Sequence, residues 1–169
     1  MNDETLTVIA QIMEDEKNNL FRYALYRLGS IDDAEDILQE LFMSLSSTAD
    51  IIEKSDNLKS YIFRSLSNNI CTHLRKRQKL QFVPLEAVDV SLIVDTEPQN
   101  FEQEYAIMEK LLNSIPAEQS EVIRLHIHGN CTFVEIAAIM ELPLTTIKSR
   151  YKYGIDKLRK GLFSNYPDY

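Results

Sequence analysis

Cysteine, glycine and proline are all scarce in this sequence, with two, four and five residues of each among 169. Cys71 and Cys131 have neither the spacing of a metal site nor that of a redox motif. We therefore expect two small packing residues in a reduced cytoplasmic setting. The shortage of helix-breaking residues, without any long strand-like alternation, favours an all-α fold.

Long apolar runs are missing too, and no stretch approaches the length of a bilayer span. The N-terminus, MNDETLTVIAQIMEDEKNN, lacks the basic start and the long apolar core of a signal peptide. These features predict a cytoplasmic protein without membrane insertion.

The residue groupings that carry catalysis are absent as well. There is no nucleophile beside a base, no phosphate-binding loop and no zinc motif, so we predict neither an enzyme nor a cofactor nor a small-molecule substrate. His126 and His128 are two residues apart, which on a helix directs them to different faces, and no third ligand is near. We expect no metal site.

Negative charge predominates, with a formal net charge of −8, but its distribution is uneven. Residues 58–80 contain six basic residues and no acid, and residues 143–162 contain six basic residues against Asp156. Overall repulsion would weaken binding to isolated DNA, whereas each local cluster can contact phosphates. This distribution predicts a DNA-binding protein that needs a partner.

The second basic stretch belongs to a pair of short helical patterns over residues 132–162, separated by Glu141-Leu142-Pro143. Thr132 and Glu135 form a capping box at the first pattern. Its apolar side carries Val134, Ile136, Ala137, Ala138, Ile139 and Met140. The second pattern has an apolar stripe, Ile147, Tyr151, Ile155, Leu158 and Leu162. Its remaining surface carries Thr145, Thr146, Lys148, Ser149, Arg150, Lys152 and Arg159.

Two helices joined by a tight turn, the second of them basic, match the physical description of a helix-turn-helix. The buried stripe would fix the second helix while its first turns enter the major groove. An ordinary helical hairpin with a solvated basic face has the same pattern. The spacing alone leaves both interpretations open.

The first helices are predicted over residues 5–45. Apolar residues recur at helical spacing over 5–28, in one long or two short helices, and Gly29 ends them. Ser30 or Asp32 caps the next helix, whose core side is Ala34, Ile37, Leu38, Leu41, Phe42 and Leu45. Its outer side carries Glu35, Asp36, Gln39 and Glu40, which on spacing alone is a solvated acidic face. Residues 46–57 read as a loop.

A longer helix is predicted from Leu58 to about Lys79. One seam is apolar, and a second face carries Arg64, Asn68, Thr72 and Arg75, extended by Lys76 and Arg77. Because this stretch contains no acid, a nucleic-acid face is favoured over a solvated one. Residues 81–103 have two prolines, five acids and no base, which is typical of a linker. Helical patterns resume at Glu104 and again near Ile115.

Several of these segments resemble the extracytoplasmic-function (ECF) group of bacterial sigma factors. The resemblance lies in Asp33 to Phe42, in Leu58 to Arg77, and in Glu135-Ile136-Ala137, Pro143, Thr146 to Arg150 and Leu158-Arg159. It implies two small helical domains joined by a flexible linker: an N-terminal sigma domain over 1–80, an acidic linker over 81–103, and a helix-turn-helix domain over 104–169.

The same resemblance implies the partners and their residues. Core RNA polymerase would be bound through its largest-subunit coiled coil and its flap, with Glu35, Asp36, Gln39 and Glu40 on the coiled coil. The downstream promoter element would meet Arg64, Asn68, Thr72, Arg75, Lys76 and Arg77, and the upstream element Thr145, Thr146, Lys148, Ser149, Arg150 and Lys152. An anti-sigma factor is an implied partner.

The sequence departs from the family pattern at a few positions. Glu141 and Thr145 stand where glycine is usual, and Gly154 where alanine is usual. Tyr61, Ser67 and Thr72 replace a tryptophan, a basic residue and an aspartate. These departures bear on turn shape and promoter preference. Two other functions remain open: a free-standing helix-turn-helix regulator with an N-terminal dimerisation or sensing domain, and an interaction protein without promoter activity.

Overall fold

The computed structural model describes residues 3–52, 57–80 and 101–165, and each regular element within these ranges is an α-helix. The N-terminal half contains α1 (Asp3–Asp15), α2 (Lys17–Leu28), α3 (Ile31–Ser47), α4 (Ala49–Ile52) and α5 (Leu58–Leu80). The C-terminal half contains α6 (Phe101–Asn113), α7 (Ala117–Ile127), α8 (Phe133–Met140) and α9 (Leu144–Asn165). The predicted all-α fold with two helical groups is confirmed.

The corner between α2 and α3 forms as the sequence predicts. Gly29 ends α2 in the left-handed conformation, with φ 73°, and its N–H donates to the carbonyl of Leu25. A Cβ at this position would lie 2.6 Å from the ring of Tyr105 on α6. Both the backbone and the neighbouring ring therefore require glycine. Ser30 then caps α3 by accepting a hydrogen bond from the N–H of Asp33 at 3.3 Å.

The segment predicted as a loop over 46–57 is largely helical where it is described. α3 continues to Ser47, and α4 covers Ala49–Ile52. Ala49 and Ile52 are buried in the core, because they extend the apolar spacing of Leu45 by four and then three residues. The serines and threonine of this segment suggested a loop, but burial of the apolar positions outweighs their weak preference. Residues 53–56 lie outside the described ranges.

Two apolar residues expected in the core are at the surface instead. Phe42 on α3 is 42% exposed and Val134 on α8 is 66% exposed. Each lies at the edge of its helix's apolar stripe, where the periodicity does not fix which side chains are covered. The inner positions agree with expectation, since Ile37, Leu41 and Ile136 are buried.

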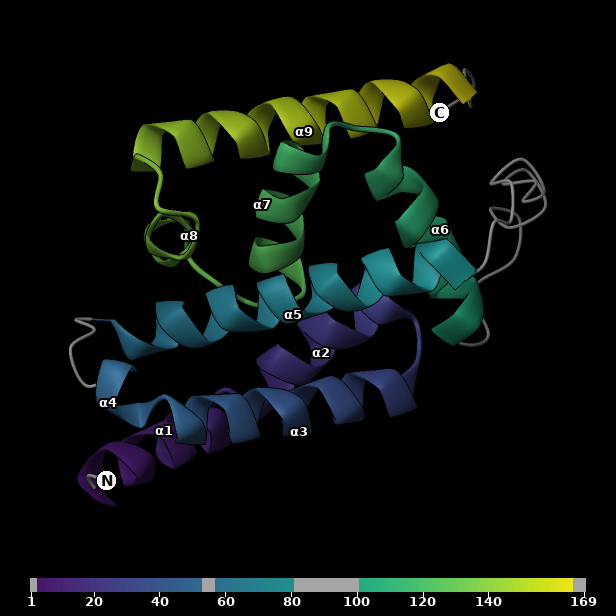
Figure 1. Ribbon diagram of the computed structural model, residues 1–169. Helices are drawn as coiled ribbons and strands as arrows, with labels where there is room; N and C mark the ends of the chain where they lie inside the picture. Colours follow the sequence, from purple (N-terminus) through teal and green to yellow (C-terminus); the bar gives the residue numbers. More distant parts are fainter. Residues whose placement is uncertain (1–2, 53–56, 81–100, 166–169) are drawn as a thin grey trace.

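α5 lies at the centre of the molecule, with α2 and α3 on one side and α7 and α8 on the other (Figure 1). One continuous core contains Phe63 and Leu66 of α5 together with Val122, Leu125 and Ile136 of the C-terminal half. Two small domains joined by a linker were expected, and their resting arrangement was left open. In the structure the two halves pack directly on each other. Residues 81–100, most of the predicted linker, lie outside the described ranges, and α6 begins at Phe101.

The helix-turn-helix has the predicted capping box, with Thr132 Oγ1 accepting from the N–H of Glu135 at 3.2 Å. α8 ends at Met140, and its C-cap residue Glu141 adopts the left-handed conformation with φ 56° and ψ 44°. α9 then crosses α7, and Gly154 makes this close approach possible, because a Cβ there would lie 2.8 Å from Cδ1 of Ile123. Close packing against α7 accounts for glycine at a helical position.

None of the helices in the described ranges combines the length and the apolar character that a membrane span requires.

Glu141→Gly is expected to stabilise the protein by about 1 kcal/mol, because a non-glycine residue in the left-handed region is strained by roughly that amount. The ion pair that Glu141 makes with Arg64, at 3.4 Å with the glutamate side chain 74% exposed, contributes little. Thermal unfolding should show a midpoint about 2–4 °C higher. Glu141→Gln, which keeps the strain and removes the charge, should leave it nearly unchanged. A glycine variant that unfolds below wild type would contradict this account.

Candidate nucleic-acid interface

The first turns of α9 gather the residues predicted to contact the upstream element. Thr145, Lys148, Ser149 and Lys152 are exposed there, and Thr146 is half-buried. Ile147 on the opposite side is completely buried, which fixes the rotation of the helix about its axis. Arg150 differs from the others because its Nη2 lies 3.5 Å from Oε2 of Glu118 on α7. The arrangement is a basic, polar helix end anchored by its apolar side, as groove binding requires.

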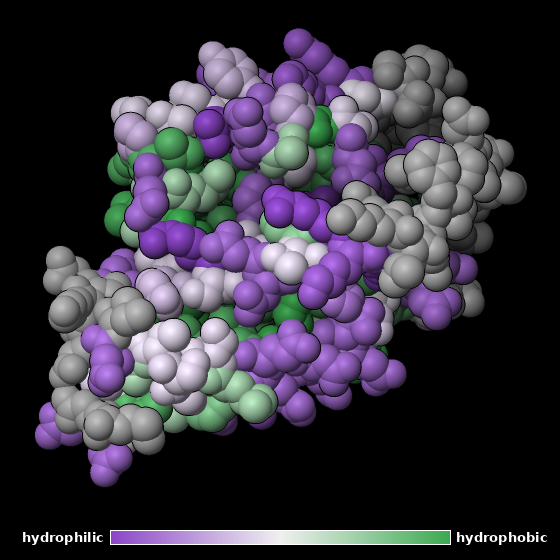
Figure 2. Space-filling model, viewed as in Figure 1, coloured by the Kyte–Doolittle hydropathy of each residue, from purple (hydrophilic) through white to green (hydrophobic). Residues whose placement is uncertain are grey.

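Of the six residues on α5 that were predicted to contact the downstream element, all except Arg64 are exposed. The exposed residues are Asn68, Thr72, Arg75, Lys76 and Arg77. Arg77 also donates from Nη1 to the carbonyl of Leu28 at 3.0 Å. Figure 2 shows hydrophilic side chains gathered over the middle of this face, where α5 runs.

Arg64 is bonded to the C-terminal half, and its side chain is 34% exposed. Its Nε donates to the carbonyl of Ile139 at 2.8 Å, and its Nη2 donates to that of Ala138 at 2.7 Å. These carbonyls belong to the last turn of α8, where they have no partners within the helix. The guanidinium also complements the negative end of the helix dipole. Arg64 therefore closes the C-terminal end of α8.

We call the contact between α2 and α5 on one side and α6, α7 and α8 on the other the seam. Lys59 of α5 pairs with Glu16 at 3.2 Å and also with Glu135 of α8. Glu121 of α7 accepts hydrogen bonds at one oxygen from Tyr23 at 2.5 Å and from Ser67 at 3.1 Å. Burial, followed by the charge of Glu121, raises the pKa of Tyr23 well above its ordinary value.

His128 occupies the other end of the seam. Its ring stacks on Tyr26 at a centroid distance of 4.1 Å, and its carbonyl accepts from Nε of Arg22 at 2.9 Å. Tyr26 in turn donates to Glu104 at 2.7 Å. His126 is engaged separately: its Nδ1 lies 2.9 Å from the carbonyl oxygen of Cys131, and its ring stacks on Phe133. Both histidines thus have structural roles.

The seam is not among the features that the sequence predicts. Its main members are Tyr23 of α2, Lys59 of α5, and Glu121 and the C-cap residue His128 of α7, and their pairing depends on long-range packing. One signal was available: Lys59 and Arg64 belong to a stretch without acids, so their partners had to come from elsewhere in the chain or from another molecule.

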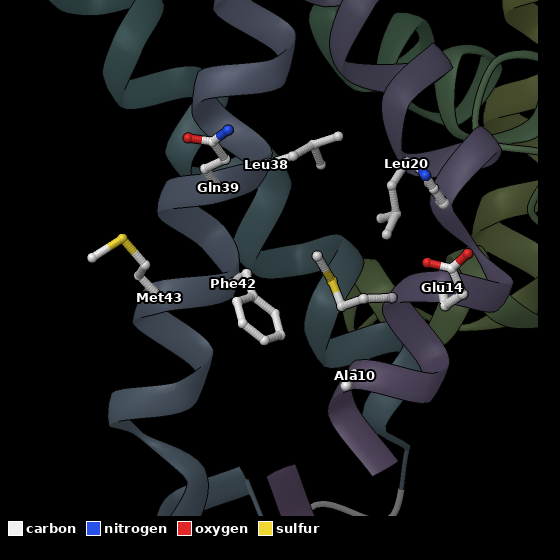
Figure 3. A pocket seen from close by; sticks show the side chains of 9 residues that line it. Ala10, Glu14, Leu20, Leu38, Gln39, Phe42 and Met43 are labelled. Atoms are coloured by element: carbon white, nitrogen blue, oxygen red, sulfur yellow. The ribbon is translucent and has the colours of Figure 1, made fainter. Parts of the chain in front are cut away.

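The acidic residues of α3 lie beside an apolar groove. Glu35, Asp36, Gln39 and Glu40 are all exposed, as predicted. A groove of about 580 Å³ runs between this helix and α1 and α2, with Phe42 bordering it on one side and Ala10 and Leu20 on the other (Figure 3). Met43 is 71% exposed. A charged rim next to exposed large apolar side chains is characteristic of a protein-binding surface.

Comparisons with known proteins agree on a family. The Sigma-70 region 2 family matches residues 12–80, and the Sigma-70, region 4 family matches residues 111–160. The chain is 23% identical over 165 residues to the ECF RNA polymerase sigma factor SigW of Bacillus subtilis, covering 90% of this chain and 88% of that one. It is 29% identical over 143 residues to the ECF RNA polymerase sigma factor RpoE of Cereibacter sphaeroides, covering 80% and 76%.

Two solved structures share the fold. One is the sigma factor RpoE in complex with the anti-sigma factor NepR from Bartonella quintana, with a TM-score of 0.59, 23% identity, and coverage of 92% of this chain and 94% of that chain. The other is CnrH in complex with the cytosolic domain of CnrY, with a TM-score of 0.68, 15% identity, and coverage of 95% and 94%. Both likenesses extend over both helical halves.

Stability is expected to fall below pH 6.5 because of His128. Burial, and then the charges of Arg124 and Arg22, lower its pKa to about 4. In the unfolded chain this histidine binds a proton as the pH falls through about 6.5. In the folded chain it binds one only near pH 4. The stability is therefore fully present above pH 6.5 and is lost between pH 6.5 and 4. Between pH 7 and 5 the loss is about 2 kcal/mol.

Urea unfolding of wild type and His128→Gln at the two pH values measures this loss. The variant should lack it, whereas His73→Gln, which removes a histidine that is 41% exposed, should retain it. Equal pH dependence in wild type and His128→Gln would show that another group is responsible.

Proposed function

The chain belongs to the ECF group of bacterial sigma factors, and from that premise we propose how its residues divide the work of promoter recognition. As a sigma factor it binds core RNA polymerase and directs promoter-specific transcription initiation. Residues 1–80 dock on the polymerase and engage and melt the downstream element, residues 104–169 read the upstream element in duplex form, and residues 81–103 link the two. The protein acts in the cytoplasm by binding, without catalysis or cofactor.

Upstream recognition is assigned to Thr145, Thr146, Lys148, Ser149, Arg150 and Lys152. The observation that carries this assignment is the orientation of α9, whose apolar side is buried through Ile147 while Lys148 and Lys152 face solvent. Lysines and hydroxyl groups in the first turns of a helix reach phosphates and base edges in the major groove.

Downstream recognition is assigned to Asn68, Thr72, Arg75, Lys76 and Arg77, which are exposed along α5, and to Arg64. In the closed arrangement Arg64 binds the end of α8. Its use on promoter DNA therefore requires the two halves to separate. We propose that the closed arrangement is the resting form and that polymerase and promoter hold an opened form.

Polymerase docking is assigned to Glu35, Asp36, Gln39 and Glu40, which face the coiled coil of the largest subunit, while the C-terminal half meets the flap. Exposure of all four on one side of α3 supports this assignment. We further propose that an anti-sigma factor binds this protein, because one structural neighbour, the sigma factor RpoE of Bartonella quintana, is in complex with the anti-sigma factor NepR.

Lys148→Ala/Lys152→Ala is expected to reduce initiation in vitro by roughly tenfold or more and to lower the salt dependence of promoter binding by about two units of slope, since two phosphate contacts are lost. Transcription with core polymerase across genomic promoters supplies the measurement. Lys157→Ala/Lys160→Ala, two exposed lysines further along α9, serves as the matched control. If wild type neither binds core nor initiates at any promoter, the function itself is refuted.

Asp36→Lys/Glu40→Lys is expected to weaken binding to core polymerase by roughly tenfold or more, because like charges then meet across the interface. Competition for core against a labelled sigma factor measures the affinity. The control reverses two exposed acids elsewhere, Glu4→Lys/Glu102→Lys, and should bind as wild type does. Unchanged affinity of the α3 variant, with its helical content intact, would remove the docking assignment.

A further inference from the structure

A cavity of about 440 Å³ lies within the seam, away from the surfaces assigned to DNA and polymerase. Both halves build it. Arg27 of α2 and Ser67 and Cys71 of α5 line one side, and Ala117, Glu121 and Arg124 of α7 line the other. A molecule bound there would contact both halves at once.

Arg124 is a buried cation with unused hydrogen-bonding capacity. Its side chain is 2% exposed, and its contact with Glu109 is long, at 3.5 Å from Nη1 to Oε2. Among the described residues its Nε has no hydrogen-bond partner. A buried N–H of a charged group that lacks a partner is costly. The side chain therefore needs an acceptor that the described part of the chain does not provide.

Arg27, on the opposite wall of the cavity, also has a buried N–H group without an acceptor. Its buried Nε also finds no partner within the described ranges, and its Nη2 donates to the sulfur of Cys71 at 3.6 Å, a weak acceptor. The two guanidinium groups repel each other: burial, and then the charge of Arg27, lower the pKa of Arg124. Two converging arginines that repel are a reason for an anion between them.

Other charges near the cavity partly offset the arginines. Glu121 lines it, but one of its oxygens is occupied by Tyr23 and Ser67. Glu109 approaches Arg124. Arg77 is a third positive charge nearby. Burial and then Glu109 raise the pKa of Tyr105, whereas Arg77, Arg124 and Arg27 act to lower it. Ala117 begins α7, and the N-cap residue Pro116 gives no side-chain cap, so the positive end of this helix dipole also faces the cavity.

We propose that this cavity binds a phosphate or diphosphate group, held between Arg27 and Arg124, and that the bound anion joins the two halves in the closed arrangement. Planar guanidinium groups match phosphate oxygens in two-point contacts, and a volume of about 440 Å³ admits either group. Inorganic phosphates and the diphosphate of a nucleotide share this chemistry.

The regulatory consequence rests on the proposed function. A ligand that binds only the closed form stabilises it by mass action. Opening, which Arg64 needs in order to reach promoter DNA, then becomes less favourable as the anion concentration rises. The anion would act as a negative regulator of initiation.

Cys71 reports directly on occupancy in the full-length protein. It is half-buried in the cavity wall, whereas Cys131 is fully buried and burial raises the pKa of its thiol to about 12, so only Cys71 should react with a thiol reagent at neutral pH. Reaction rates are measured with pyrophosphate, with inorganic phosphate, with a nucleoside diphosphate, and with chloride at matched ionic strength. A ligand at ten times its dissociation constant should slow labelling about tenfold.

The variants locate the effect. Arg27→Gln and Arg124→Lys should each lose most of the protection; the second keeps the charge and removes the two-point geometry. Arg159→Gln, exposed on α9, should keep it, and Cys71→Ser should abolish the labelling signal. Protection by all phosphates assigns the site to the phosphate group alone, and protection by the nucleotide only assigns it to a diphosphate that carries a base.

Labelling that stays fast up to 10 mM of every probe, with the protein folded, would overturn the proposal, and so would protection that both arginine variants retain.

The regulatory effect is tested by in-vitro transcription with and without the protecting anion. Initiation by wild type should fall several-fold in the presence of the anion, whereas initiation by Arg27→Gln should not. Protection without any transcription activity would leave the site standing and refute the proposed function instead.

Discussion

The guanidinium group of Arg64 closes the C-terminal end of α8, and the relation between the two halves follows from that contact. Two backbone carbonyls that the helix cannot satisfy are bonded by a side chain from the other half. Phe63 next to it enters the shared core. The same helix α5 therefore carries both the proposed promoter-melting face and the contact that occupies one residue of that face, Arg64.

Some of the basic residues that the sequence suggested for nucleic-acid binding form ion pairs across the seam. In a chain of net charge −8, the acid-free stretch 58–80 looked like a nucleic-acid surface alone. Two of its cations, Lys59 and Arg64, are partnered by Glu135 and Glu141 of the helix-turn-helix. Of these two cations, Arg64 is the one that is proposed to meet DNA phosphates, and Glu141 pairs with it here.

Local signals in the sequence were sufficient for the helices and their ends, because capping and turn formation depend on neighbouring residues. Thr132 with Glu135, Gly29 and Ser30 all have the predicted roles. The exposed acids of α3 and the exposed cations of α9 could likewise be predicted from periodicity. Phe42, Val134 and the seam could not, because they depend on which surfaces of distant elements meet. The paired arginines Arg27 and Arg124 lie far apart in sequence for the same reason.

The seam also joins residues that are made at different times. Arg22 and the carbonyl of His128 are 106 positions apart, and Arg64 and that of Ile139 are 75 apart. At about 5–20 residues per second of synthesis, the partner of Arg64 leaves the ribosome roughly 4 to 15 s after Arg64 itself. During that interval every newborn molecule presents its N-terminal half uncovered, so a polymerase or inhibitor that binds this half during translation meets it before self-closure is possible.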